Sequence, residues 1–501
     1  MRKGSFSTSN QLTCIDILTV FLFAVLSYVL YYNTLQGEFL FDDLRLILHN
    51  PQIKIPDLSF GSLINSASTT RPVAMLSFAL NYYFHGDNVT GYHIVNIIIH
   101  FFSGIFLYFF IKTTLQLPSV HERYQNMVWL PFVTASLWLV NPIHTQSVSY
   151  IIQRMNSLSA MFYILAMMLY SKARTSISQT RQYLLLTLCV ISFFLALGSK
   201  EIAATLPFFV FLYEWYFFQN LKKKWLKNFL IWGGIFCLLL LILYVTLPAF
   251  FPTGIISSGY RVYDFTLTQR VLTEFRVVLL YVGLIFFPHP SRLNLDYDFS
   301  LSYSLLDPST TLIAVTLCLA GFFLAVFLAK REKLISFCIL WFTGNLVIES
   351  SVIPLDLVFE HRTYLPSMLL ILLSVALASR TISQKSIKVC IFIFLVACSS
   401  TWTIQRNNVW KNALNLLIDT AQKSPEKARP FYNVACEYAK KNDAEGTIFW
   451  LRQSISKDDF NRWDLIKNDR DLDKIRNSVE FKQFLEDTVP PKYRSFFDHY
   501  E

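Results

Sequence analysis

The chain has 501 residues, of which 53% are hydrophobic and only 16% are charged, and phenylalanine alone occurs 46 times. A soluble domain of this size could not bury so much apolar surface, so the composition excludes an ordinary soluble protein and predicts a polytopic helical membrane protein. The net charge of +10 comes from short basic clusters between apolar stretches, a pattern typical of topology anchors rather than of nucleic-acid binding.

Apolar segments recur along the whole chain. A bilayer span needs about 20 mostly apolar residues, and the pattern predicts an all-α protein with about 11 spans. The first segment follows Arg2 and Lys3 and lacks a small-residue cleavage site, which predicts a retained signal anchor. Segment 270–288 is predicted to be an interfacial or re-entrant helix, and the short segment 76–84 is predicted to lie along the membrane. The predicted spans are 15–32, 92–111, 128–140, 155–170, 183–198, 202–218, 229–247, 310–329, 334–348, 366–379 and 387–404.

The basic clusters predict the orientation of these spans. When the N-terminus starts in the cytoplasm, every cluster, including the run 222–227, falls on the cytoplasmic side. The extracytoplasmic loops contain isolated charges instead, which are costly at span ends unless they pair or serve a pathway. These loops are therefore predicted to build one shared site. They are 33–71, 141–154, 198–201, 248–309 and 349–366.

The first of these loops contains EFLFDD, which ends in the adjacent carboxylates Asp42 and Asp43. Neighbouring side chains diverge in helices and strands, so both can address one substrate only from an irregular turn or through a shared metal ion. The ordinary alternative is a helix N-cap before LRLILHN, which explains at most one of the two. Their position just beyond the first span makes both candidate catalytic residues. One acidic pair offers too few ligands for a dedicated metal site, so no metal ligand is assigned and a divalent cation is not required.

The other outer loops supply candidate ligands for an anionic group, namely Arg154, Lys200, His361 and Arg362. Arginine can bind phosphate through two N–H groups, while lysine acts as a point charge. The alternatives are that the arginines snorkel to lipid headgroups and that His361 is an ordinary buried histidine. Lys200 and Glu201 do not face each other as neighbours on a helix, so each is predicted to have a separate partner.

Three further charged residues of the outer loops have two interpretations each. Arg71, before Pro72, closes the first loop and is interpreted either as the salt-bridge partner of the acidic pair or as a substrate contact. Asp296 and Asp298 in LNLDYD would share a face in an extended segment, but a solvated loop is favoured over a binding role.

After residue 404 the composition becomes polar. The stretch ARPFYNVACEYAKKNDAEGTIFWLRQSISKD predicts two amphipathic helices joined at Asn442–Asp443, with the spacing of a tetratricopeptide repeat of about 34 residues. We therefore predict a transmembrane domain over 1–404 and a helical domain over 405–501, which the span count places outside the cytoplasm. Such a domain can bind a peptide or partner, or act as a lid that stabilises the fold.

These features together resemble one family. The acidic pair after the first span, with GYHIVNIIIHF, IIQRMNSLSAMFYILAMMLY, LGSKEIAATLPFFVFLYE, LNLDYD and FEHRTYLPS, is similar to the transmembrane-and-tetratricopeptide O-mannosyltransferases and their bacterial relatives. That family lies within the GT-C superfamily of glycosyltransferases. The tail departs from it, with one clear repeat where the family carries several.

The resemblance implies an inverting transferase that takes a monosaccharide, such as mannose, from a polyprenyl- or dolichyl-phosphate donor. It implies that Asp42 is the base and that Asp43 orients the acceptor or binds a divalent ion. The residues that it assigns to binding of the lipid phosphate or substrate are Arg71, Arg154, Lys200, Glu201, His361 and Arg362. The implied acceptor is a hydroxyl, chiefly a Ser or Thr of an exported protein.

Other functions stay open at this stage. The acceptor could instead be a glycan or lipid, or the chain could be a lipid-linked-sugar transporter without enzymatic activity. A transporter is expected to place its charges at mid-membrane and to show internal repeats, whereas these charges gather at span ends, which favours the enzyme. The expected location is a bacterial inner membrane first and the endoplasmic reticulum second, with the active site and the helical domain extracytoplasmic and no nucleic-acid partner.

Overall fold

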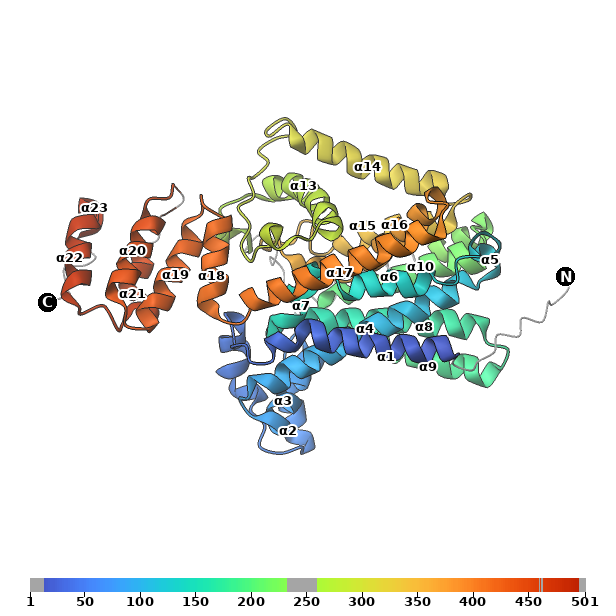
Figure 1. Ribbon diagram of the computed structural model, residues 1–501, viewed down its shortest axis with the longest axis horizontal. Coiled ribbons are helices and arrows are strands. Elements are labelled where there is room, and N and C mark those ends of the chain that lie inside the picture. Colours follow the sequence, from blue (N-terminus) through green and yellow to red (C-terminus); the bar gives the residue numbers. More distant parts are fainter. Residues whose placement is uncertain (1–12, 232–258, 459, 461–462, 495–501) are drawn as a thin grey trace.

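The computed structural model describes residues 13–231, 259–458, 460 and 463–494. Within these residues the chain forms helices and loops and contains no β-strand, as the composition predicts. Long helices run side by side along the long axis of the molecule, and the C-terminal helices stack across one end of this bundle (Figure 1). The tail therefore lies at one end of the bundle only (Figure 1).

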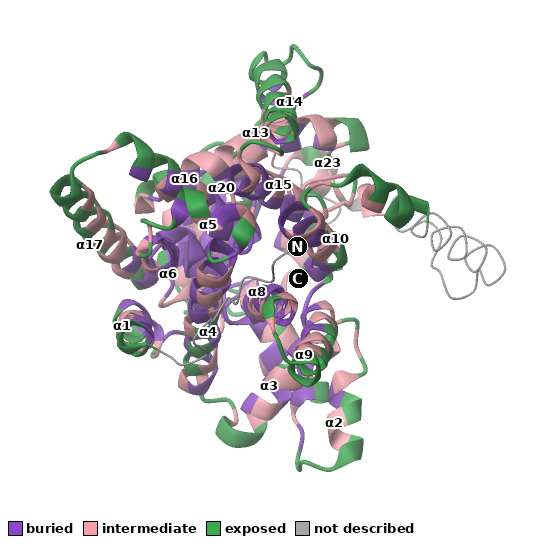
Figure 2. Ribbon diagram, turned by 90° about the vertical axis from the view of Figure 1, so that its right-hand side faces the viewer, coloured by how far each residue is buried: buried purple, intermediate pink, exposed green. Residues whose placement is uncertain are grey.

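The inner helices of the bundle are mostly buried, and the outer helices expose apolar side chains. Viewed along the bundle, the buried residues lie at the centre and the exposed ones on the surrounding helices (Figure 2). The inner helices are α4 (Val89–Leu115), α6 (Leu130–Leu139), α8 (Arg154–Thr175), α10 (Leu206–Tyr213), α15 (Lys333–Leu346) and α16 (Ser367–Thr381). The outer helices are α1 (Cys14–Tyr31), α9 (Gln179–Leu197), α14 (Thr310–Leu328) and α17 (Lys385–Val409).

Five of the described helices are long and apolar enough to cross a bilayer: α1 with the turn that follows it, α4, α9, α14 and α17. The shorter apolar helices α6, α15 and α16 coincide with predicted spans, as do α8 and the helical run 201–218. Of the predicted span 229–247, only residues 229–231 are among the described residues. The chain is thus a multi-pass helical membrane protein, and the total of about 11 spans remains a prediction.

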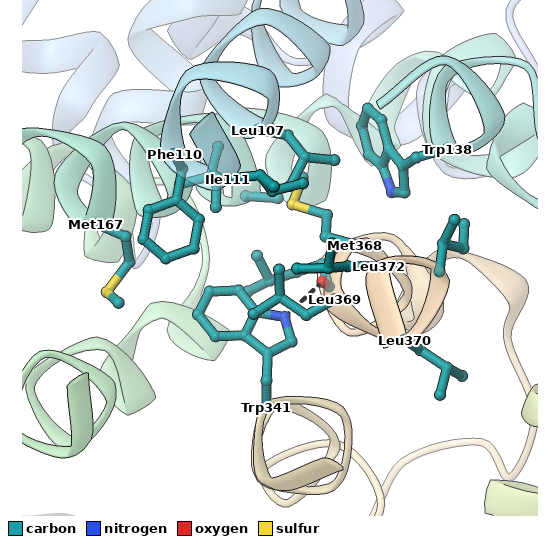
Figure 3. Close-up of a cluster of buried hydrophobic side chains, with 14 of the residues drawn as sticks. Leu107, Phe110, Ile111, Trp138, Met167, Trp341, Met368, Leu369, Leu370 and Leu372 are labelled. Atoms are coloured by element: carbon teal, nitrogen blue, oxygen red, sulfur yellow. Dashed lines mark hydrogen bonds between the residues drawn. The ribbon is translucent and has the colours of Figure 1, made fainter. Parts of the chain in front are cut away.

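The bundle core fixes the backbone of one outer loop. Trp341 of α15 and Trp138 of α6 pack with Phe110 of α4 around α16 (Figure 3). The indole N–H of Trp341 donates to the carbonyl of Leu365, and that of Trp138 donates to the carbonyl of Tyr364, each at 3.1 Å. Buried indole N–H groups need such partners. The two bonds hold the backbone directly after the predicted site residues His361 and Arg362.

Helix starts follow the local sequence. Thr13 and Asp16 form a capping box at α1, in which the Thr13 hydroxyl accepts from the Asp16 N–H at 3.2 Å. Asn88 at α4 and Asp443 at the tail helix α20 (Ala444–Ile455) are N-caps, whose side-chain oxygens accept from backbone N–H groups. These side chains satisfy backbone N–H groups that have no partner within the helix.

Four further helices lie beside the bundle: α2 (Phe60–Ala67), α3 (Pro72–His85), α5 (Pro118–Tyr124) and α13 (Leu267–Phe286). Helix α13 contains residues 270–286 of the segment 270–288, which is predicted not to cross the membrane, and it is not among the five candidate spans. Helix α5 lies at the end opposite the tail (Figure 1). There Arg123 and Arg380 both pair with Glu332.

The tail consists of stacked helices at the other end. They are α18 (Ala413–Lys423), α19 (Ala428–Lys440), α20 (Ala444–Ile455), α21 (Trp463–Asn468), α22 (Val479–Thr488) and α23 (Pro491–Arg494). Helices α19 and α20 form the predicted pair with its turn at Asn442–Asp443. Helix α17 continues from its apolar part through residue 404 to Val409, so the predicted domain boundary lies within one helix.

Candidate active site

The two carboxylates of the first outer loop lie in different environments. Asp43 is fully buried. Its Oδ2 accepts from the N–H of Leu40 at 2.9 Å, and its Oδ1 accepts from the N–H of Ile152 at 2.7 Å. Asp43 therefore closes its own turn and joins it to the second outer loop. It precedes the helical turn η2 (Leu44–Leu48), but its side chain does not cap that turn.

Burial raises the pKa of Asp43 to about 8, although the backbone N–H groups of Leu40 and Ile152 oppose the shift. The neighbouring Asp42 carboxylate adds to the increase. An acid with such a pKa is mostly protonated at neutral pH. With both oxygens directed at backbone donors, Asp43 has the geometry of a positioning residue.

Asp42 faces outward from the same turn. Its side chain is 56% exposed and lies 3.7 Å from the guanidinium of Arg45. The turn depends on Phe41, whose φ of 48° lies in the left-handed region, which is rare for a bulky residue and occurs where the surrounding structure imposes it. The hydroxyl oxygen of Tyr150 accepts from the Asp42 N–H at 3.1 Å. The backbone of Asp42 is thus held while its carboxylate stays accessible.

A buried ion pair forms the centre of the second half of the site. The ammonium of Lys200 lies 2.7 Å from Oε1 of Glu349 and 3.0 Å from Oδ1 of Asn156. Burial lowers the pKa of Lys200, and the adjacent carboxylate opposes that shift. Lys200 lies just before the helical turn η6 (Glu201–Thr205), and Glu349 lies after α15. The pair therefore joins two of the predicted outer loops.

Two buried arginines and one glutamate adjoin this pair. Arg270 lies 3.0 Å from Glu274, and Arg362 lies 4.0 Å from the same carboxylate. Arg362 also donates to the carbonyls of Leu357 and Asp356 at 2.8 and 2.6 Å. Together with Lys200 and Glu349, these residues place three buried cations against two buried carboxylates. A surplus of buried positive charge favours the binding of an anion.

His361 lies between these groups, in the helical turn η11 (Glu360–Thr363). Its backbone N–H donates to Oε1 of Gln146 at 2.8 Å, and its Nδ1 lies 3.2 Å from the same oxygen. Burial lowers the pKa of His361, and the charges of Lys200, Arg362 and Arg71 lower it further. Because the Gln146 oxygen can only accept, Nδ1 carries the proton of the neutral ring, and Nε2 is an acceptor.

Arg71 pairs with Glu201 and not with the acidic pair. Its Nε and Nη2 donate to the two carboxylate oxygens of Glu201 at 3.0 and 2.9 Å. The interpretation of Arg71 as the partner of Asp42 and Asp43 is therefore wrong. The prediction that Lys200 and Glu201 have separate partners is confirmed.

Arg154 is fully buried and directed into the protein. Its guanidinium donates to Asn96, Asn81 and the carbonyls of Ser77 and Tyr92 at 2.6 to 3.2 Å. The structure thus shows no snorkelling arginine, and these hydrogen bonds use four of the five N–H groups of Arg154. Phosphate binding by Arg154 stays a prediction, and its contacts are those of a structural residue.

The segment 150–156 connects the two halves of the site. Tyr150 and Ile152 contact the turn of Asp42 and Asp43, whereas Asn156 contacts Lys200 and donates to the carbonyl of His361 at 2.7 Å. Ile152 and Asn156 are four residues apart, which corresponds to about 6 Å along a helix axis. The acidic turn and the cation cluster therefore lie next to each other at the end of the bundle near the tail.

The sequence predicts no role for several residues that the structure places in the site. Glu349, Asn156 and Gln146 lie in the predicted outer loops or directly beside them, but nothing in their spacing marks their partners. Arg270 and Glu274 do have a signal, an i, i+4 spacing of opposite charges within an apolar segment. The prediction that Asp296 lies in a solvated loop is wrong, because its carboxylate pairs with Lys427 and Arg429 at 2.9 and 2.7 Å.

Comparison with known proteins gives relatives named as protein O-mannosyl-transferases. The chain is 34% identical over 160 residues to protein O-mannosyl-transferase F38B6.6 of Caenorhabditis elegans, a match covering 30% of this chain and 22% of that protein. It is 32% identical over 164 residues to protein O-mannosyl-transferase TMTC1 of Homo sapiens, covering 30% and 18%. To protein O-mannosyl-transferase Tmtc3 of Drosophila melanogaster it is 26% identical over 256 residues, covering 46% and 27%.

The matched part thus spans 18% to 27% of the length of these three relatives. No family model and no solved structure matches the chain. The resemblance inferred from the sequence is confirmed, since the chain is similar to protein O-mannosyl-transferases of the TMTC group over 30% to 46% of its length.

Proposed function

We propose that this chain is an integral membrane glycosyltransferase that moves a monosaccharide, such as mannose, from a polyprenyl- or dolichyl-phosphate donor to a hydroxyl of an exported protein. The observation that carries the proposal is the exposed carboxylate of Asp42, held next to a buried cluster with surplus positive charge. The names of the relatives support the sugar and the protein acceptor. The tail and the site lie at one end of the bundle, and the basic loops at the other support an extracytoplasmic site.

In the proposed reaction Asp42 removes the proton of the acceptor hydroxyl. The oxygen attacks the anomeric carbon with inversion, while the bond from that carbon to the phosphate oxygen breaks. The leaving lipid phosphate takes both electrons of the broken bond. Lys200 and Arg362 stabilise its charge, and a buried cluster does so more effectively than solvent.

The residues of the cluster have different proposed roles. Arg71 and Glu201 hold the loop ends together, and Asp43 positions Asp42. Nε2 of neutral His361 is an acceptor, which suits a sugar hydroxyl better than a phosphate oxygen. Asp43 directs both oxygens at backbone N–H groups, so the geometry supports orientation of Asp42 rather than binding of a divalent ion.

The test is sugar transfer from a radiolabelled polyprenyl-phosphate hexose by the purified chain, with and without chelator. We expect Asp42→Asn to lower the rate of transfer by about 100-fold or more, because a general base contributes about that much, while donor binding is kept. Asp43→Asn is expected to retain partial activity with a less stable first loop.

Each outcome decides between functions. Full activity in Asp42→Asn would refute the base assignment. Donor binding without transfer by the wild-type chain, tested with peptide, glycan and lipid acceptors, would instead indicate a lipid-linked-sugar transporter. Loss of activity in chelator that is restored by a divalent cation would assign a metal to the reaction.

A further inference from the structure

A cavity of about 790 Å³ lies between the tail and the outer loops. One wall is formed by the start of α19 and parts of the tail helices behind it. The other wall is formed by three loops of the membrane part, 263–265, 295–301 and 356–359. The volume is within the range of ligand-binding sites, and such sites occur preferentially where two parts of a chain meet.

The charged residues of the cavity are unbalanced. Its lining contains the carboxylates Asp264, Asp296, Asp356 and Asp469, against the cations Lys427 and Arg429. Both cations bind Asp296, and Arg429 reaches Asp356 only at 3.9 Å. The lining therefore has a formal charge of −2, and Asp264 and Asp356 keep partly accessible carboxylates.

Aromatic rings form much of the remaining surface, including Tyr263, Phe265, Tyr297 and Phe359. Carboxylates beside aromatic faces suit the ammonium or guanidinium group of a basic side chain, with its methylene groups against the rings. Asn433 of α19 adds an amide that can donate to and accept from a peptide group. The negative lining disfavours nucleic acid and anionic lipid headgroups.

The cavity shares residues with the candidate active site. Phe359 in its wall stacks on His361 with ring centroids 5.1 Å apart, and the carbonyls of Asp356 and Leu357 accept from Arg362. On the other side, Phe41, next to Asp42, packs against the apolar cluster of α18 and α19. A chain segment bound in the cavity would thus lie close to both halves of the site.

We propose that this cavity binds an extended segment of the acceptor polypeptide that carries a lysine or arginine near the accepting hydroxyl. The inference rests on the proposed function for its biological meaning. Peptide binding can be tested without that function. We expect a basic peptide to bind in the cavity, with an affinity that depends on the carboxylates of Asp264 and Asp356. Electrostatic complementarity of this kind gives specificity.

The test measures binding of fluorescent peptides to the full-length chain in lipid nanodiscs, with no sugar donor present. One short peptide contains serine, threonine and lysine, and two matched peptides have glutamine or glutamate in place of lysine. The variant is the double substitution Asp264→Asn with Asp356→Asn, which brings the lining to formal neutrality. Asp298→Asn, in the same loop as Asp296 but outside the lining, is the matched control.

We expect the lysine peptide to bind about tenfold more tightly than the glutamine peptide, and the double variant to lose that difference. Raising the ionic strength should have the same effect, and Asp298→Asn should bind like wild type. Equal binding of all three peptides, or a lysine preference that the double variant retains, would overturn the proposal. Because the assay needs no turnover, failure of sugar transfer leaves its result unaffected.

Discussion

At the scale of single residues, the structure separates two carboxylates that are neighbours in sequence. Asp43 is buried against backbone N–H groups, and Asp42 is exposed. The sequence predicts the pair but cannot predict this division, because it depends on the positive φ of Phe41 and on a contact to Ile152 in another loop. The resemblance names Asp42 as the base, and the geometry supports the same residue.

The buried Lys200–Glu349 pair contributes to both stability and donor binding in the proposed site, and substitutions separate the two effects. Lys200→Met leaves the Glu349 carboxylate buried without its main counter-charge, and we expect a loss of about 3 kcal/mol of stability. The double variant Lys200→Met with Glu349→Met should recover most of that stability, because neither charge remains buried. It should still bind the lipid-phosphate donor poorly. Thermal unfolding in detergent and donor binding measure the two effects separately.

The affinity for the donor distinguishes a binding role of Lys200 from a structural one. A double variant that is stable and binds the donor as tightly as wild type would show that Lys200 has only a structural role.

At the scale of elements, the turn η11 connects the tail to the cation cluster. Glu360 is buried, and its Oε1 accepts from the N–H of Asn294 at 2.6 Å and from the hydroxyl of Tyr297 at 3.0 Å. The next two residues, His361 and Arg362, face the cluster. On the tail side, Ser424 and Lys423 bind the same 290–296 loop. The loop thus lies between α18 and the residues proposed to bind phosphate.

A pair of substitutions at Glu360 tests this connection. Glu360→Leu removes the acceptor of two buried donors, and we expect a loss of about 2 to 4 kcal/mol of stability together with a raised KM for the donor. Glu360→Gln keeps an acceptor oxygen and should be close to wild type in both quantities. Similar behaviour of the two variants would show that the hydrogen bonds of Glu360 do not position η11.

At the scale of the whole molecule, Asp296 is one of the residues that hold the tail to the membrane part, because it binds both Lys427 and Arg429. We expect Asp296→Asn to loosen this junction, since it leaves two cations without their shared partner. Hydrogen exchange should then become faster in the first turn of α19 and in the 290–298 loop, but not in α4. Unchanged exchange in α19 would show that the ion pairs of Asp296 do not hold the tail in place.

The sequence predicts the architecture better than the contacts. The basic clusters identify which loops lie on one face, and the structure brings 33–71, 141–154, 198–201 and 349–366 together as predicted. Individual partners are less predictable, because they depend on tertiary placement. Lys200 and Glu349 are 149 positions apart, and Arg154 finds its acceptors on α3 and α4. No local pattern encodes such pairs.

Helix α17 is continuous from its lipid-facing part to the start of the tail. Its 25 residues reach about 37 Å, more than the roughly 30 Å of a bilayer core. Its last turns are tied to α1 and α18, since Asn407 donates to the carbonyl of Leu30 and Arg406 pairs with Asp419. A thicker or thinner bilayer changes the tilt of such a helix. We therefore expect a change in membrane thickness to shift the junction between the tail and the site.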